Sequence, residues 1–326
     1  MISWGIIGCG DVTEVKSGPA FNKVPDSRLV AVMRRNGKKA ADYARRHGVP
    51  RWYTEASDLI HDKEVTAVYI ATPPRFHEEY AVAALEAGKP VYLEKPMTLD
   101  AAGARRVQDA VERTGLPLVV AHYRRAQPLF RKIKECLDQQ MLGTLQGVHL
   151  RLWQPHRTDL IARTEEPWRT DPALSGGGLF HDLAPHQLDL LRFYFGEATG
   201  ISGLSGNRGG HYGADDFVTG YFQLAGGLPF TGSWCFSAPA ETAIDECMIL
   251  GSTGSLRFSF FGQPVLYLTR NGNTEVMEFE RLAHVQQPMI AATVQHFLGN
   301  GPNPCPVTEG VAVMEQMEAM TGVKRL

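Results

Sequence analysis

The sequence has no long apolar run and few cysteines. No uninterrupted apolar stretch approaches the roughly 18 residues of a membrane-spanning helix. Met1-Ile2-Ser3-Trp4 leads straight into a strand-like segment, without the basic and apolar regions of a signal peptide. The 5 cysteines are odd in number, widely scattered and never arranged as CxxC, which indicates neither a disulfide framework nor a thiolate metal site. We therefore expect a cytoplasmic protein with free thiols, no membrane partner and no bound metal.

The sequence also lacks an excess of charge of either sign. Lys and Arg number 33 and Asp and Glu number 35, for a formal net charge of -2. Such a balance gives no long-range attraction to nucleic acid or to anionic membranes. The 326 residues exceed the roughly 100 to 200 of one domain. We expect two domains and no nucleic-acid or membrane partner.

The first part of the chain alternates short apolar strands with helices. The expected strands are 2–7, 28–33, 51–53, 66–72, 91–93 and 116–121, and the expected helices are about 11–22, 38–47, 55–61, 76–88 and 99–114. This alternation is typical of a parallel, doubly wound α/β sheet with right-handed crossovers. The pattern predicts a dinucleotide-binding Rossmann domain over residues 1–121.

A glycine-rich turn follows the first strand directly, as Gly8-Cys9-Gly10-Asp11-Val12-Thr13. In such a turn the first glycine permits the tight bend and the second lets the backbone approach a pyrophosphate, which rests on the following helix. Thr13 stands where a third glycine usually allows close helix–strand packing. We predict that Gly8, Gly10, Asp11, Val12 and Thr13 bind the cofactor; a purely structural turn is the alternative.

The second strand ends in Arg34-Arg35-Asn36-Gly37-Lys38-Lys39. An NAD enzyme usually carries an Asp or Glu about 20 residues after the glycines, on the ribose 2′-hydroxyl, whereas an arginine accommodates the 2′-phosphate of NADP. Without a carboxylate here, Arg34 and Arg35 favour NADP. The alternative is a solvated basic helix start.

Two other strand ends carry polar residues that should meet at the ligand edge of the sheet. Thr72, Pro73 and His77 follow the strand 66–72, and we expect them at the cofactor, although His77 could equally be a solvated first-turn histidine. Glu94 and Lys95 follow the strand 91–93 and precede Pro96, which restricts the direction in which the lysine leaves the strand.

Beyond Gly143 the pattern changes to long alternating segments joined by short turns. The expected strands are 144–153, 199–204, 216–224, 230–237, 244–251, 255–260, 265–269 and 275–279, with helices at about 180–195, 288–298 and 309–320. Another helix, at about 127–140, precedes them. This predicts a large, open, mostly antiparallel sheet in a second α+β domain, residues 122–326, that binds substrate. Helices on one face leave the other face open. We expect this face to form a homodimer or homotetramer.

The helix 180–195 follows the triplet Gly176-Gly177-Gly178 and carries Asp182, His186 and Asp189, which its spacing puts on one face. Reduction of a carbonyl by a nicotinamide needs a proton donor at oxygen, which a histidine supplies near neutral pH, and a lysine stabilises developing negative charge. An Asp–His pair on a helix is alternatively surface decoration. A zinc site lacks HExxH, and a serine hydrolase lacks the GxSxG elbow.

Together the glycine turn, the AGKPVYLEKP segment (residues 87–96) and the GGGLFHDLAPHQLD segment (residues 176–189) resemble the glucose-fructose oxidoreductase / inositol dehydrogenase / rhizopine catabolism (Gfo/Idh/MocA) family. The resemblance covers essentially the whole chain. It implies that Lys95, Asp182 and His186 are catalytic and that Glu94 lies beside the nicotinamide ribose. It also implies Tyr123 and Arg124 near the substrate and a cis Lys95–Pro96 bond. Trp168 and Arg169 are candidates for the pocket lining, with a structural tryptophan as the alternative.

These observations predict an NADP-dependent oxidoreductase that acts on CH–OH groups of a sugar, polyol or related carbonyl compound. One alternative is an NAD-dependent member of the same family. The other is a non-catalytic dinucleotide sensor, because a fold does not determine a function.

Overall fold

The structure, a computed structural model, describes residues 1–158, 160–161 and 168–322. The chain divides into two compact units. The first comprises Met1–Ala126 with Leu282–Met314, and the second comprises Gln127–Arg281 with the residues from Glu315 onward. Residues 282–314, which the sequence pattern groups with the second domain, thus lie in the first compact unit.

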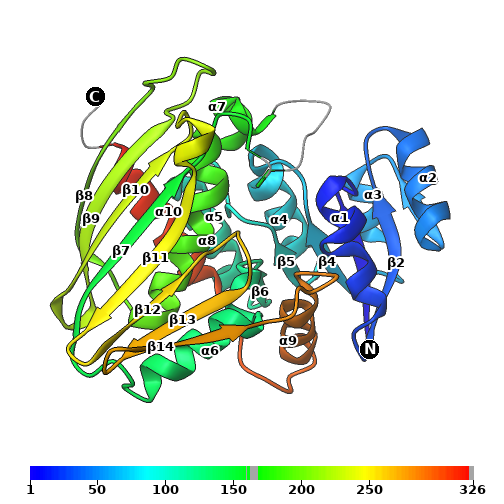
Figure 1. The fold of residues 1–326 in the computed structure, drawn as a ribbon. Helices are drawn as coiled ribbons and strands as arrows, with labels where there is room; N and C mark the ends of the chain where they lie inside the picture. Colours follow the sequence, from blue (N-terminus) through cyan, green and yellow to red (C-terminus); the bar gives the residue numbers. More distant parts are fainter. Residues whose placement is uncertain (159, 162–167, 323–326) are drawn as a thin grey trace. The chain divides into compact units, whose positions relative to one another are not determined.

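The described residues of the first unit form a six-stranded parallel sheet in the order β3-β2-β1-β4-β5-β6 (Figure 1). Its strands are β1 (Ile2–Ile7), β2 (Ser27–Met33), β3 (Arg51–Tyr53), β4 (Ala67–Ile70), β5 (Val91–Leu93) and β6 (Leu118–Val120). Its helices are α1 (Asp11–Val15), α2 (Gly37–His47), α3 (Ala56–His61), α4 (His77–Glu86), α5 (Ala101–Thr114) and α9 (Gln287–Phe297). The predicted doubly wound Rossmann sheet is confirmed, and the strand order reverses between β1 and β4, where such sheets bind ligands.

The two faces of this sheet are covered by different parts of the chain. On β1, Trp4 is fully buried against Phe21, Tyr92 and Phe297, the last of which belongs to α9. The next residue, Gly5, points to the opposite face, where an added Cβ would lie 2.6 Å from Leu59 of α3. Successive strand residues face opposite sides, so a helix from near the C-terminus packs on one face and α3 on the other.

The helix expected over residues 11–22 is instead two pieces. α1 ends at Val15, and a 3-10 helix runs from Gly18 to Asn22. Pro19 stands at the start of the second piece, where a residue without an N–H is tolerated but cannot continue a preceding α-helix. Only one short turn of α-helix therefore follows the glycine turn.

The second unit is built on an eight-stranded sheet of described residues, in the order β14-β13-β12-β11-β7-β10-β9-β8. Its strands are β7 (Leu145–Trp153), β8 (Thr199–Gly206), β9 (Phe217–Leu224), β10 (Leu228–Cys235), β11 (Ile244–Gly251), β12 (Gly254–Phe258), β13 (Val265–Arg270) and β14 (Asn273–Glu278). Its helices are α6 (Pro128–Asp138), α7 (Pro172–Ser175) and α8 (Gly178–Phe195), together with the end of α10 (Val307–Thr321). β7 and β10 pair in parallel and the other neighbours pair antiparallel, which confirms the predicted mostly antiparallel sheet.

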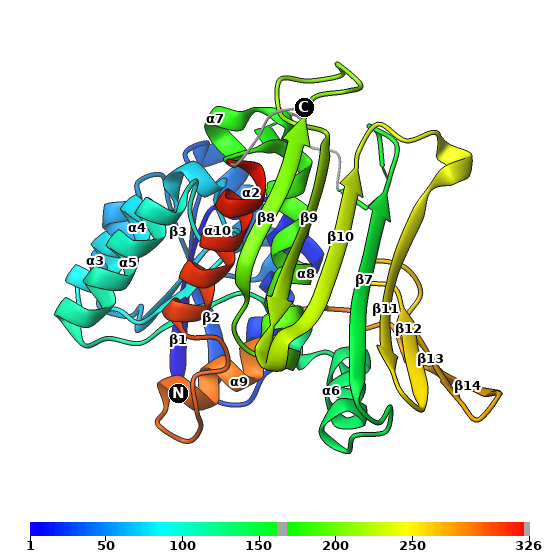
Figure 2. The same ribbon diagram turned by 90° about the vertical axis from the view of Figure 1, so that its left-hand side faces the viewer.

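One face of this second sheet carries α6, α8 and the end of α10, and no described helix of the second unit lies on the other face (Figures 1 and 2). Along β7, Val148, Leu150 and Leu152 are buried, while His149 and Arg151 between them are exposed. The helix-free face is populated by polar pairs such as Arg151–Glu246 at 2.7 Å. In the part of the chain that the structure describes, no helix is long and apolar enough to cross a membrane.

Candidate functional site

The glycine turn lies at the point where the first sheet reverses its strand order. Gly8 has φ +92°, and an added Cβ would stand 2.8 Å from the backbone nitrogen of Thr72, at the end of β4. A side chain is therefore excluded both by conformation and by the close approach of the β4 loop. At Gly10 the nearest atom to an added Cβ is the Gly8 carbonyl oxygen, 3.9 Å away, which leaves open space above the turn.

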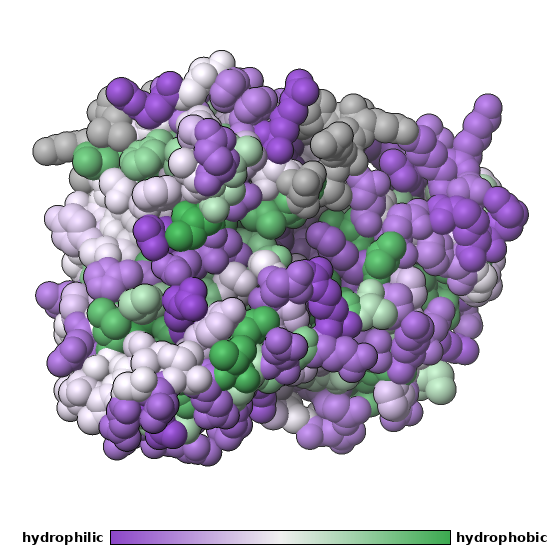
Figure 3. All heavy atoms as spheres, in the orientation of Figure 1, coloured by the Kyte–Doolittle hydropathy of each residue, from purple (hydrophilic) through white to green (hydrophobic). Residues whose placement is uncertain are grey.

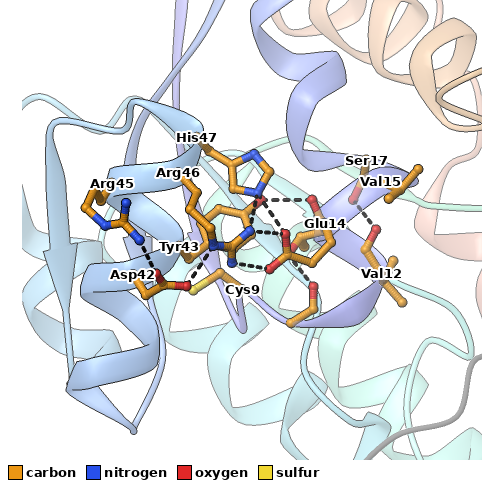
Figure 4. A network of polar contacts seen from close by, with 12 residues as sticks. Cys9, Val12, Glu14, Val15, Ser17, Asp42, Tyr43, Arg45, Arg46 and His47 are labelled. Carbon is orange, nitrogen blue, oxygen red and sulfur yellow. Dashed lines mark hydrogen bonds and ion pairs between the residues drawn. The ribbon is translucent and has the colours of Figure 1, made fainter.

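Thr13 fits its position through its own hydrogen bonds. Its side chain is fully buried, its hydroxyl donates to the Gly10 carbonyl at 2.7 Å, and its carbonyl accepts from the Tyr43 hydroxyl at 2.8 Å. One residue on, Glu14 is held at 2.7 Å by Arg46 and at 2.8 Å by His47, both at the end of α2 (Figure 4). The Arg46 guanidinium keeps the pKa of Glu14 below its usual range. The short α1 is thereby tied to α2.

Arg34 lies beside the same turn, and Arg35 follows it in the chain. The Arg34 guanidinium donates to the Cys9 carbonyl at 3.3 Å, and the Arg35 guanidinium lies 5.0 Å from the centroid of the Phe76 ring. Helix α2 begins just after them with Asn36 as its N-cap. Hydrophilic side chains gather over α2 at the right of Figure 3. The Arg34 guanidinium thus lies at the glycine turn, and the Arg35 guanidinium packs on the Phe76 ring, between β4 and α4.

The β4 loop is joined to the loop after β5 by His77. Its ring nitrogens lie 2.7 Å from the Thr72 carbonyl and 2.9 Å from the Pro96 carbonyl, and the side chain is fully buried. The alternative of a solvated first-turn histidine is therefore wrong. Burial lowers the pKa of His77 to about 4, although the two carbonyls favour the charged ring. The Thr72 hydroxyl beside it is buried and has no hydrogen-bond partner among the residues that the structure describes.

Glu94 emerges from β5 as a buried carboxylate, only 6% exposed. Its Oε1 accepts hydrogen bonds from the Tyr69 hydroxyl and from Gln286 Nε2, both at 2.6 Å. Its Oε2 lies 3.2 Å from the backbone nitrogen of Lys95. The Lys95–Pro96 peptide bond is cis, as the family resemblance implied.

Tyr123 and Arg124 begin the 3-10 helix Tyr123–Ala126 after β6. The Arg124 guanidinium lies 5.6 Å from the centroid of the Tyr123 ring, and Tyr123 is 6% exposed. The next residue, Arg125, forms a 2.9 Å ion pair with Glu309. This pair, which the sequence pattern did not indicate, joins the loop after β6 to α10 within the first unit.

In the second unit, the residues predicted around the glycine triplet do lie together. Arg169 Nε is 3.3 Å from Asp182 Oδ2, and both side chains are about nine-tenths buried, at 11% and 12% exposure. The Arg169 guanidinium lies over the Trp168 ring, 4.4 Å from its centroid. The three residues form a stacked, charge-paired group at the start of α8.

Helix α8 runs unbroken through Pro185, so Asp182 and His186 remain four residues apart on one face. His186 is 4% exposed, and its ring centroid lies 5.8 Å from that of Phe261. The helix starts at Gly178, whose φ is +76° and whose added Cβ would come within 2.5 Å of Ala214. The glycine triplet therefore allows the entry of α8 to approach the loop before β9 closely.

Family models match both parts of the chain. An oxidoreductase family with an NAD-binding Rossmann fold matches residues 2–122, and the GFO/IDH/MocA C-terminal domain matches residues 130–257. The chain belongs to the GFO/IDH/MocA family of oxidoreductases. It is 47% identical to Oxidoreductase P35 of Formosa agariphila over 98% of each chain. It is 28% identical to 1,5-anhydro-D-fructose reductase of Ensifer adhaerens, over 78% of this chain and 75% of that protein.

Solved structures share the fold over the whole chain. Levoglucosan dehydrogenase in complex with NADH superposes with a TM-score of 0.88 at 20% identity, covering 98% of this chain and 95% of that one. As a GFO/IDH/MocA member, the protein is an NAD(P)-dependent oxidoreductase. The residues present fit a dinucleotide, because the open space at Gly10, the unpartnered Thr72 hydroxyl and the adjacent Arg34 offer room, a hydrogen-bonding group and positive charge.

The buried histidines predict a loss of stability in acid. Burial lowers the pKa of both His77 and His181 from 6.5 to about 4. Between these values the unfolded chain binds protons that the folded chain does not, so stability falls as pH decreases. We expect about 1–2 kcal/mol of destabilisation per histidine at pH 5 relative to pH 7.5. Urea unfolding at both pH values measures this, and His77→Gln and His181→Gln should each reduce the difference. If both variants lost as much free energy of unfolding between pH 7.5 and pH 5 as the wild type, the prediction would be contradicted.

Proposed function

We propose that this family member transfers hydride between nicotinamide C4 and a carbon of a sugar, polyol or related carbonyl compound, with a preference for NADP(H). The supporting observation is that two groups suited to this chemistry occur on the elements where the family pattern expects them. Glu94 and Lys95 follow directly after β5, and Asp182 and His186 share a face of α8. A dinucleotide sensor would need neither Lys95 nor the pair Asp182 and His186.

Each residue has a proposed role that its surroundings support. The Lys95 ammonium would hydrogen-bond the substrate oxygen and stabilise negative charge as it develops there. His186 would give a proton to that oxygen during reduction and take it during oxidation. Asp182, charge-paired with Arg169, would orient the histidine or a substrate hydroxyl.

We propose that the dinucleotide binds along the glycine turn, at Gly8, Gly10, Asp11, Val12 and Thr13. Thr72 and Pro73 would contact it from the β4 loop, with His77 holding that loop from behind. Glu94 would lie beside the nicotinamide ribose, and Lys95 would face both cofactor and substrate. Tyr123, Arg124, Trp168 and Arg169 would contribute to substrate binding.

A sugar-like substrate is proposed from the relatives and from the polar side chains available. Hydrogen-bonding groups on tyrosine and arginine side chains suit a polyhydroxylated molecule. One relative is named for anhydrofructose and one similar structure for levoglucosan. A turnover screen of sugars and polyols with both nucleotides, in both directions, measures which substrate is used.

Removing Lys95 or His186 tests the catalytic assignment. Lys95→Ala and His186→Ala should each lower kcat by about 10²-fold or more, the usual loss when a general acid–base or charge-stabilising group is removed. The exposed residues Lys63 and His61 provide matched controls as Lys63→Ala and His61→Ala. Near wild-type turnover in both test variants, with nucleotide still bound, would refute these roles.

Replacing the arginines after β2 tests the nucleotide preference. Arg34→Gln with Arg35→Gln should weaken NADPH binding about tenfold or more and change NADH binding little, because the 2′-phosphate would be the only part of the nucleotide that the guanidinium groups contact. Fluorescence titration of both nucleotides measures this, with Lys63→Gln as the control for lost surface charge. Glutamine at position 34 keeps an N–H donor for the Cys9 carbonyl, so the glycine turn should be preserved. A wild-type protein that prefers NADH would support the NAD-dependent alternative.

We also propose that the helix-free face of the second sheet forms a homodimer or homotetramer. That face combines polar pairs with exposed apolar side chains, including Tyr221 at 59% exposure and Val276 at 52%. Such a mixture of aromatic and polar groups is typical of an interface.

A charge introduced on this face, at Tyr221 of β9, tests the proposed association. Tyr221→Glu should shift the protein toward monomer at micromolar concentration in light scattering coupled to gel filtration, because an unpaired carboxylate would be buried between copies. Lys63→Glu, in the first unit, controls for the change of charge. A monomeric wild-type protein would contradict the proposal.

A further inference from the structure

Gln286 lies directly before α9 and contacts several elements of the first unit. Its backbone N–H donates to the Lys16 carbonyl at 3.2 Å, just after α1. Its side-chain Nε2 donates to Glu94 Oε1 at 2.6 Å, and its Oε1 accepts from the Tyr92 hydroxyl at 3.0 Å. The side chain is fully buried. One residue near the C-terminus therefore reaches both the segment after the glycine turn and the carboxylate that ends β5.

Tyr69 supplies the second donor to the same carboxylate oxygen. Its hydroxyl lies 2.6 Å from Glu94 Oε1 and 3.1 Å from Ser17 Oγ, and the shorter contact to a charged oxygen takes its single proton. Burial, with the charge of Glu94, raises the pKa of Tyr69 well above its ordinary value. The phenol therefore remains a donor throughout the working pH range.

These contacts account for the whole hydrogen-bonding capacity of Glu94 Oε1. A carboxylate oxygen has two lone pairs, and Tyr69 and Gln286 occupy both. Oε2 is left facing the backbone N–H of Lys95 at 3.2 Å. Tyr69 and Gln286 thus fix the orientation of the carboxylate through Oε1. Through Oε2, the carboxylate in turn constrains the backbone at Lys95.

We propose that Gln286 and Tyr69 are positioning residues that hold the Glu94 carboxylate and, through it, the direction in which Lys95 leaves β5. This proposal rests on the proposed function only for its effect on turnover. Without these donors a buried carboxylate would be undersatisfied and would turn toward solvent. The backbone contact at Lys95 would then be lost, and its ammonium would occupy a wider range of positions.

The kinetic test uses Gln286→Leu and the milder Tyr69→Phe, which removes a single oxygen atom. Each should lower kcat by about tenfold or more, since small misplacements of a reacting group cost this much. Gln287→Leu makes the same chemical change one residue on and should leave kcat unchanged. In a double-mutant cycle, adding Gln286→Leu to Glu94→Gln should lower kcat by less than about a further twofold. The reason is that both substitutions disrupt the same Gln286–Glu94 interaction. The proposal would be overturned if the fold-losses in kcat of Gln286→Leu and Glu94→Gln multiplied in the double variant. Wild-type turnover in both Gln286→Leu and Tyr69→Phe would also overturn it.

A second measurement does not depend on turnover. Competitive labelling with acetic anhydride, read by mass spectrometry, reports the reactivity of each lysine. Lys95 should react about threefold faster or more in Gln286→Leu and Tyr69→Phe than in the wild type, since the released side chain is more accessible, while exposed Lys63 should not change. Unchanged Lys95 labelling in both variants would refute the positioning role. If the wild type binds nucleotide but turns over no substrate, the proposed function fails, and the labelling result still decides the role of Gln286.

Discussion

A carboxylate can stay buried only if hydrogen-bond donors of the protein replace the water it has lost. In the first unit, the buried side chain of Glu94 imposes this requirement. One donor is Tyr69 of β4, and the other is Gln286 at the start of α9, 192 residues after Glu94 in the chain. Because Gln286 also bonds the Lys16 carbonyl, the same residue ties down the segment after α1. The glycine turn and the end of β5 are therefore supported by one buried polar network.

This network explains why residues 282–314 belong with the first unit. Helix α9 brings Phe297 against Trp4 on one face of the parallel sheet, and it begins at the residue that satisfies Glu94. Apolar burial supplies the non-directional part of this attachment, and the hydrogen bonds of Gln286 supply its register. The packing energy and the alignment of polar groups act at the same place.

In the second unit, the sheet holds the helix α8, which carries Asp182 and His186. Trp234 of β10 packs against Phe180 and donates to Gln187 at 2.6 Å, so α8 is held by contacts on both sides of Asp182 and His186. Arg169 then pairs with Asp182 from outside the helix. The candidate catalytic side chains thus project from a helix whose rotation about its axis is fixed by the sheet beneath it.

Much of the fold could be predicted because its signals are local. The apolar runs Ile2–Ile7 and Val91–Leu93 and the alternation along Leu145–Trp153 each report burial on two faces or one face of a strand, and the structure confirms them. The spacing of Asp182 and His186 similarly follows from helical periodicity alone. The break at Gly18-Pro19 was missed although it is a local signal too, because a proline cannot continue a preceding α-helix.

The roles of Gln286, Tyr69 and the Arg125–Glu309 pair could not be predicted, since each depends on a partner between 25 and 192 residues away. His77 shows the same limit: its sequence position suits a solvated helix start, and only the two carbonyls placed beside it make it a buried link between loops. The sequence by itself determined most of the strands and helices and the kinds of chemical groups at their ends. The reason is that helical and strand periodicity depends on residues close together in the chain. The tertiary structure decided which buried polar atoms meet, because hydrogen bonds between distant segments exist only once the sheet and its covering helices have formed.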